Sequence, residues 1–162
     1  MSTFCLHRLM GALGALGILL AAFAPVALHA QAADLAAAAA PRGSDPALYR
    51  ALGGRYGIDR LVDDFVQRLL RDSRMRPFFE DADLPNLRLR LAEQFCVVAG
   101  GPCTYGGKDM KKVHEGVDID KADFNALVEV LQQSMDARGI PFSAQNRLLA
   151  KLAPMHREVI NR

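Results

Sequence analysis

The sequence predicts an all-α fold, and three observations support this prediction. After residue 45, apolar residues recur at spacings of three and four, the pattern of helices with one buried face. Capping residues, glycines and prolines divide this part of the chain into segments of helical length. No segment alternates apolar and polar residues for long enough to indicate a strand.

The first 32 residues have the composition of a secretory signal peptide. Arg8 is their only charged residue, residues 11–28 are apolar, and Ala30-Gln31-Ala32 fits a small-x-small cleavage site. We expect cleavage after Ala32 and export to a periplasm or beyond. The alternative is an uncleaved inner-membrane anchor, because about 18 apolar residues approach the length of a membrane span. Pro25 weakens that alternative.

Residues 33–44 are predicted to be a low-complexity linker, and residues 45–162 are predicted to form one folded domain. Removal of Arg8 with the leader lowers the formal net charge from +2 to +1. A net charge so close to zero gives no indication of a nucleic-acid or membrane-surface partner. We expect no stable membrane span after cleavage.

The first two predicted helices lie within residues 44–54 and 57–73. The first has a Ser/Asp cap and Pro46 in its first turn, and a pair of glycines ends it. The second has one apolar face, formed by Ile58, Leu61, Val62, Phe65 and Leu69. A turn-rich connection over residues 75–84, which contains two adjacent phenylalanines, leads to the third helix.

The third helix is predicted to begin at the cap residue Asp83 and to run to Gly100-Gly101. At about 100° per residue, four apolar residues and one amide share a narrow stripe: Leu87, Leu91, Gln94, Phe95 and Val98. Cys96 falls on the opposite face. A glutamine in an apolar stripe costs desolvation unless it finds a partner. Either Gln94 reaches a backbone group, or the stripe faces a ligand with a polar atom.

A glycine-rich loop and a short basic segment that contains His114 precede the fourth helix. The fourth helix is predicted from the cap residue Asp120 to Gly139. The last helix opens on a serine, and Pro154 is expected to kink or shorten it. His156 is expected near the C-terminal end of that helix, where a cationic side chain is favourable, and no chemistry is assigned to it.

His114 is the candidate metal ligand. A lone histidine is more often structural, yet one imidazole is all that an iron porphyrin requires from a globin-type site. Such a site also requires aromatic and apolar contacts and cations for two propionates. The chain has candidates for each: Phe79 and Phe95; Leu87, Leu91, Met110, Val113 and Ile119; Arg90, Lys111 and Lys112. Each of these residues also has an ordinary explanation as a core residue or a solvated charge.

These segments resemble the group I truncated haemoglobins over about residues 47–160. The most specific run is FCVVAGGPCTYGGKDMKKVHEGVDI, residues 95–119, with LYRALGG, VDDFVQRLLRD and PFF matching before it and ADFNALV and LLAKLAP after it. The resemblance implies a truncated globin fold, in which two helices stack on two. It also implies haem b (iron protoporphyrin IX) bound through the histidine that matches His114, and a diatomic gas ligand: oxygen, nitric oxide or carbon monoxide.

The resemblance assigns positions around the haem as well. Phe79 matches an aromatic residue that packs on the haem, and Arg90 matches a basic residue near a propionate. Tyr105 and Met110 match residues of the loop and of the proximal wall. With the candidates above, the predicted haem-binding set is Phe79, Leu87, Arg90, Leu91, Gln94, Phe95, Tyr105, Met110, Val113, His114 and Ile119.

The predicted distal side departs from the family. Truncated haemoglobins commonly place a tyrosine on the second helix and a glutamine on the third as donors to the bound gas, whereas this chain has Val66, Leu87 and Leu91 there. One donor would stabilise bound oxygen by about 1 to 3 kcal/mol, so its loss should speed oxygen release and oxidation to ferric iron. Gln94 is the candidate substitute donor.

Four functions remain open, and reversible gas binding by a haem protein is the leading one. The second is a haem enzyme, either a weak peroxidase or a nitric oxide dioxygenase with an external reductase. A peroxidase requires a distal acid or base, which Val66, Leu87 and Leu91 do not offer. The third is a haem-free helical interaction domain, and the fourth is a haem carrier or gas sensor.

Two cysteines, Cys96 and Cys103, remain after the leader is removed. Two thiols seven residues apart can pair in an oxidising compartment, but this spacing alone does not decide whether they do. Since Cys96 is predicted to point away from the haem face, we expect no ligation of iron by its sulfur.

Overall fold

The structure is a computed structural model, and it describes residues 46–162. Within that range the regular elements are all helices, which confirms the predicted all-α class. The expected signal peptide (1–32) and linker (33–44) lie outside the described residues. No helix within residues 46–162 is both long enough and apolar enough to cross a membrane.

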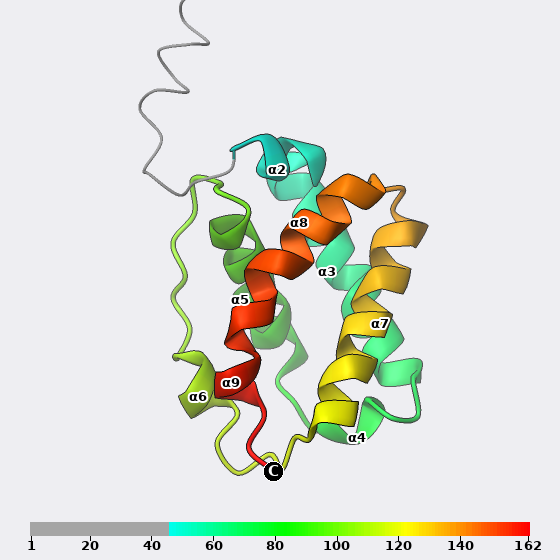
Figure 1. Ribbon diagram of the computed structural model, residues 1–162, viewed down its shortest axis with the longest axis vertical. Helices are drawn as coiled ribbons and strands as arrows, with labels where there is room; N and C mark the ends of the chain where they lie inside the picture. The colour runs from blue at the N-terminus through cyan, green and yellow to red at the C-terminus, as the bar shows by residue number, and fades with distance from the viewer. Residues whose placement is uncertain (1–45) are drawn as a thin grey trace, which may run out of the picture.

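Four long helices form the frame of the domain (Figure 1): α3 (Gly54–Arg71), α5 (Leu84–Val98), α7 (Lys121–Ala137) and α8 (Phe142–Leu152). α3 packs against α5 and α7, and α8 contacts α5 and α7. The frame is therefore one pair, α3 and α5, stacked on a second pair, α7 and α8. The short elements are α2 (Pro46–Ala51), α4 (Arg76–Phe79), α6 (Met110–Val113), the 3₁₀ turn η1 (Ala153–Met155) and α9 (His156–Val159).

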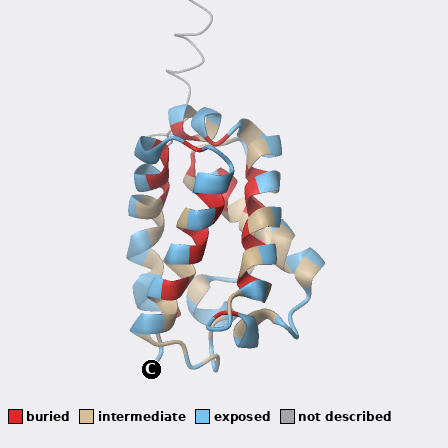
Figure 2. Cartoon of the chain, turned by 90° about the vertical axis from the view of Figure 1, so that its right-hand side faces the viewer, coloured by how far each residue is buried: buried red, intermediate tan, exposed pale blue. Residues whose placement is uncertain are grey.

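The hydrophobic core lies between the two helix pairs. The predicted apolar face of α3 is confirmed, because its five residues and Val66 are all buried. Val130 and Met135 of α7 and Leu148 of α8 are also almost fully buried. Figure 2 shows the buried parts of the helices, in red, on the sides that face the interior of the domain. Each buried aliphatic side chain contributes about 1.5 to 3 kcal/mol to folding, so α3 is the centre of the core.

Two predicted helix starts are confirmed by their caps. The Asp83 side chain accepts a hydrogen bond from the backbone N–H of Asn86 at the start of α5. At the start of α7, Asp120 accepts from the Asp123 N–H while the Asp123 carboxylate accepts from the Asp120 N–H. These reciprocal bonds satisfy N–H groups that a helix leaves unpaired in its first turn.

Three predicted boundaries differ from the structure. α3 begins at Gly54, three residues earlier than predicted, because Gly53 (φ +84°) and Gly54 (φ +64°) turn the chain directly from α2 into α3. The connection before α5 contains a one-turn helix, α4. The predicted interruption of the last helix is confirmed, because α8 ends at Leu152 and Pro154, which lacks an N–H, lies in η1. His156, however, begins the one-turn α9 and does not lie near the end of a long helix.

Candidate functional site

α5 has a core face and a second, half-buried face. Its buried residues are Ala92, Phe95 and Cys96. Four of the five residues of the predicted stripe are only half-buried, namely Leu87, Leu91, Gln94 and Val98. The fifth, Phe95, turns into the core, and its ring centroid lies 6.4 Å from that of Phe65. A largely apolar face that packing leaves half-covered is a candidate surface for an apolar ligand.

The Gln94 amide lies between α5 and the segment that carries His114. Its Nε2 donates to Sδ of Met110 at 3.2 Å and to Sδ of Met155 at 3.3 Å. The backbone partner considered from the sequence is therefore not the one found. Because a thioether sulfur is a weak acceptor, these two bonds satisfy the amide only partly.

His114 ends the one-turn helix α6 with its ring half-buried. Its Nδ1 lies 2.7 Å from the backbone oxygen of Met110. A carbonyl oxygen only accepts, so a neutral ring carries its proton on Nδ1 and leaves a lone pair on Nε2. Among the described residues, Nε2 has no hydrogen-bond partner. Metal-ligating histidines have this arrangement, in which one nitrogen donates to a carbonyl and the other binds the metal.

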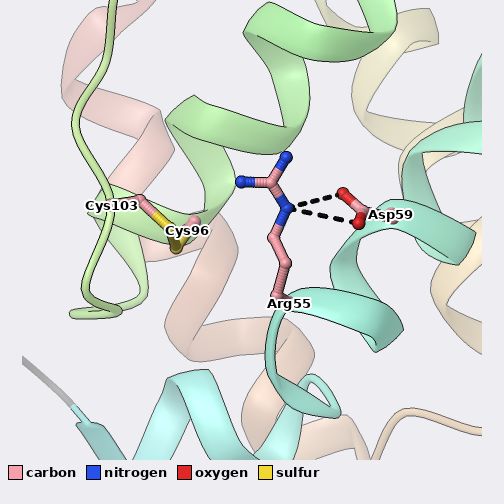
Figure 3. The surroundings of a disulfide bond; sticks show 4 residues. All are labelled: Arg55, Asp59, Cys96 and Cys103. Carbon is pink, nitrogen blue, oxygen red and sulfur yellow. Dashed lines mark hydrogen bonds and ion pairs between the residues drawn. A yellow bond between two sulfur atoms is a disulfide. The ribbon is translucent and has the colours of Figure 1, made fainter.

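The loop before α6 is joined to α5 at two places. A disulfide links Cys96 of α5 to Cys103, with 5.9 Å between their Cα atoms (Figure 3). One turn earlier, the Glu93 carboxylate accepts from the N–H of Gly106 at 2.9 Å and pairs with Arg90 at 2.8 Å. The Gly106 N–H first, and the Arg90 guanidinium second, hold the pKa of Glu93 below its usual value. These bonds fix the position of the loop that leads into α6.

The turn that begins this loop requires glycine. Gly100 has a φ of +76°, a conformation that other residues rarely adopt. A Cβ on Gly101 would lie 2.6 Å from Cys96 Sγ and from the ring of Tyr49. The Gly-Gly pair thus lets α2, the end of α5 and the disulfide pack closely together.

The structure brings part of the predicted set together. Leu87, Leu91 and Gln94 share the half-buried face of α5, and the contact of Gln94 with Met110 joins that face to α6. Phe79 of α4 is half-buried and packs against the core.

The other predicted residues have contacts of their own. Arg90 forms an ion pair with Glu93. The Tyr105 hydroxyl donates to the Lys108 carbonyl within the loop, and partial burial raises the pKa of Tyr105. Val113 is 47% exposed. Ile119 forms backbone hydrogen bonds with the C-terminal residues.

Sequence reasoning did not identify Met155, whose sulfur accepts from Gln94. It follows a proline in η1, where no regular periodicity indicates which way a side chain points. Phe124 lies in the family-like run ADFNALV, which assigns it no contact, yet its ring centroid lies 6.3 Å from that of His156. Both contacts join residues more than 30 positions apart, so only the folded chain reveals them.

The donor chemistry fits an iron porphyrin. Within residues 46–162, no group of three His, Cys, Asp or Glu side chains could hold a bare metal ion. A single imidazole with a free nitrogen is instead the axial ligand that a haem requires. Such a flat apolar group also requires apolar contacts, and half-buried apolar side chains that pack against the core occur on four helices: Phe79, Leu87, Leu91, Leu127, Leu149 and Leu152.

Comparisons with known proteins identify the family of the chain. Residues 47–161 match the bacterial-like globin family. The chain is 32% identical over 120 residues to the group 1 truncated hemoglobin GlbN of Synechocystis, covering 70% of this chain and 97% of that protein. It is 30% identical over 119 residues to GlbN of Mycolicibacterium paratuberculosis, covering 73% of this chain and 88% of that protein.

Solved structures show the same fold. The Fe(III) form of truncated hemoglobin from Tetrahymena pyriformis has a TM-score of 0.68 at 23% identity, over 71% of this chain and 98% of that one. The 2/2 hemoglobin of Synechococcus, solved with covalently attached heme, has a TM-score of 0.66 at 22% identity, over 71% and 98% of the two chains. The family match and the sequence relatives confirm the resemblance, and the chain belongs to the group 1 truncated haemoglobins, globins that bind haem and gas ligands.

Proposed function

We propose that this globin holds haem b through Nε2 of His114 and binds a diatomic gas reversibly. The observation that carries the proposal is the state of that ring: Nδ1 is committed to the Met110 carbonyl, and Nε2 is unpartnered among the described residues. When bound, the haem iron supplies the coordination position at which the gas is held.

The Met110 carbonyl has two effects on His114. It fixes the orientation of the ring through Nδ1, and by accepting a hydrogen bond from Nδ1–H it makes Nε2 a better donor of its lone pair. The neutral imidazole, with its lone pair on Nε2, is the form of histidine that ligates iron.

The predicted distal residues favour binding over catalysis. Val66 is fully buried on α3, and Leu87 and Leu91 are half-buried on α5. Their hydrocarbon side chains have no group that could donate or accept a proton, which acid–base chemistry on a bound ligand would require. Of the four half-buried residues of the predicted stripe, Gln94 alone has a hydrogen-bond donor in its side chain, and its amide is directed to two sulfurs.

We also propose that the protein is exported with residues 1–32 as a cleaved leader. The apolar run and the Ala30-Gln31-Ala32 site support this proposal. The Cys96–Cys103 disulfide supports it independently, because such bonds persist in oxidising compartments and are rare in a reducing cytosol.

A haemin titration of the full-length protein tests the proposed ligand, and His156→Ala is a matched control. The His156 Nδ1 also bonds to a backbone oxygen, that of Ala153 at 2.8 Å, but its side chain is exposed. We expect a Soret band in the wild type and in His156→Ala, with a reversible shift when carbon monoxide is added to the reduced protein. In His114→Ala, haemin affinity should fall at least about tenfold.

The titration can also contradict the proposal. A folded wild-type protein that takes up no haemin would support a haem-free helical domain. Equal haemin affinity in His114→Ala and the wild type would remove His114 as the ligand while leaving the globin fold intact.

A further inference from the structure

The last two residues fold back onto the segment that carries His114. The Asn161 side chain donates through Nδ2 to the backbone oxygen of His114 at 2.7 Å, and its Oδ1 accepts from the Ile119 N–H at 2.7 Å. The backbone N–H groups of Asn161 and Arg162 both donate to the Ile119 oxygen, at 3.0 and 3.2 Å. One asparagine therefore bridges the two ends of the loop over residues 115–118, where α9 lies beside α6 (Figure 1).

This loop does not hold its shape by local bonds alone. α6 is a single turn, and an isolated turn is not stable in water. Gly116 has a φ of +78°, and Asp118, which has a side chain, has a φ of +55°. A residue other than glycine stays in that left-handed region only when its surroundings hold it there. The bonds from the C-terminal residues to Ile119, directly after Asp118, are such a restraint.

Asn161 acts on the same residue whose ring carries the free nitrogen. The His114 carbonyl is one of the acceptors that a helix leaves unpaired at its C-terminal end. It accepts from the Asn161 amide at 2.7 Å and from the Val117 N–H at a longer 3.2 Å. The Met110 oxygen restrains the imidazole itself. The peptide group and the ring of His114 are therefore restrained separately.

From this geometry we infer that Asn161 is a positioning residue for His114. Asn161 sets the orientation of the imidazole toward the iron, and this orientation determines how strongly the haem is retained. This role rests on the proposed function of His114 as the ligand. Partners that orient a metal-binding side chain affect both affinity and the metal–ligand bond.

The expected effect is moderate because the bonds of Asn161 are exposed to solvent. An open depression of about 530 Å³ lies beside them, lined by charged residues that include Lys111, Lys112 and Arg157. One or two exposed hydrogen bonds correspond to about a five- to tenfold change in a rate or affinity.

Four variants of the full-length, haemin-loaded protein separate the possibilities. Asn161→Ala removes both side-chain bonds, whereas Asn161→Asp keeps an acceptor for Ile119 but has no N–H for the His114 carbonyl. Arg162→Ala removes the ion pair with Asp120 (3.0 Å) and leaves the Asn161 side chain in place. Asn146→Ala changes an exposed asparagine of α8 and is the matched control for the substitution itself.

Two quantities are measured: the rate of haem transfer to an excess of a haem-accepting apoprotein, and the iron–histidine stretching band of the ferrous protein. We expect both Asn161 variants to lose haem about five- to tenfold faster and to show a shifted or broadened band. The two controls should stay within about twofold of the wild type and keep its band.

The band distinguishes positioning from simple stability. Faster haem loss in the Asn161 variants with an unchanged band would mean that Asn161 only stabilises the fold, and would overturn its positioning role. An unchanged rate and an unchanged band would overturn it as well. A wild-type protein that binds haemin but shows no iron–histidine band would instead refute His114 as the ligand.

Discussion

The core between the helix pairs and the His114 segment, residues 103–119, are held together by different means. Ile58, Leu61, Met135 and Leu148 in the core are fully buried. In the His114 segment no residue is buried. A disulfide, a capping aspartate, Glu93 and the C-terminal residues hold that segment in place. Burial of apolar side chains therefore stabilises the core, whereas a disulfide and hydrogen bonds stabilise the His114 segment, which lies beside the proposed haem site.

The largest effect that this comparison predicts is in the core. Leu61→Ala should lower the free energy of unfolding by about 2 to 5 kcal/mol, because it leaves a cavity at a fully buried position. Val113→Ala, in the His114 segment, should change it by less than about 0.5 kcal/mol because that side chain is 47% exposed. Urea denaturation of the haem-free proteins measures both. Similar losses in the two variants would contradict the comparison.

A smaller effect is expected at the disulfide. Cys103→Ser should cost about 2 to 3 kcal/mol, since the bond closes a short loop and restricts the unfolded chain. Reduction of the wild type should shift its urea midpoint to that of the variant, and the non-reduced protein should be lighter by about two hydrogens. If the mass is unchanged on reduction, Cys96 and Cys103 are not bonded to each other.

The smallest effect is a change in acid sensitivity. The folded-state pKa of Glu93 is lowered, so its contribution to stability is present above its unfolded pKa, about 4.3, and is lost as the pH falls through the folded value. Glu93→Gln should therefore flatten the dependence of unfolding free energy on pH between about 3 and 5. Equal slopes in Glu93→Gln and the wild type would contradict the role of Glu93.

The sequence predicted the features that depend on residues close together in the chain. The apolar periodicity of α3 and the caps Asp83 and Asp120 gave the main helices, because these signals act within a few residues. His114 was found from its residue type and its place in a family-like run.

The other parts of the site depend on contacts between distant residues. Met155 meets Gln94 from 61 positions away, and Asn161 reaches His114 from 47 positions away. No spacing rule connects such pairs. Cys96 and Cys103 are close in sequence, but predicting that they pair also requires the geometry of the turn at Gly100-Gly101.

The most direct test of the central claim removes the His114 side chain and supplies imidazole from solution in its place. Haemin-loaded His114→Gly should lose the wild-type Soret spectrum, and imidazole added to the solution should restore it by occupying the space left by the side chain. Wild-type spectra in His114→Gly without imidazole, or no response of the variant to imidazole, would contradict coordination of the haem iron by His114.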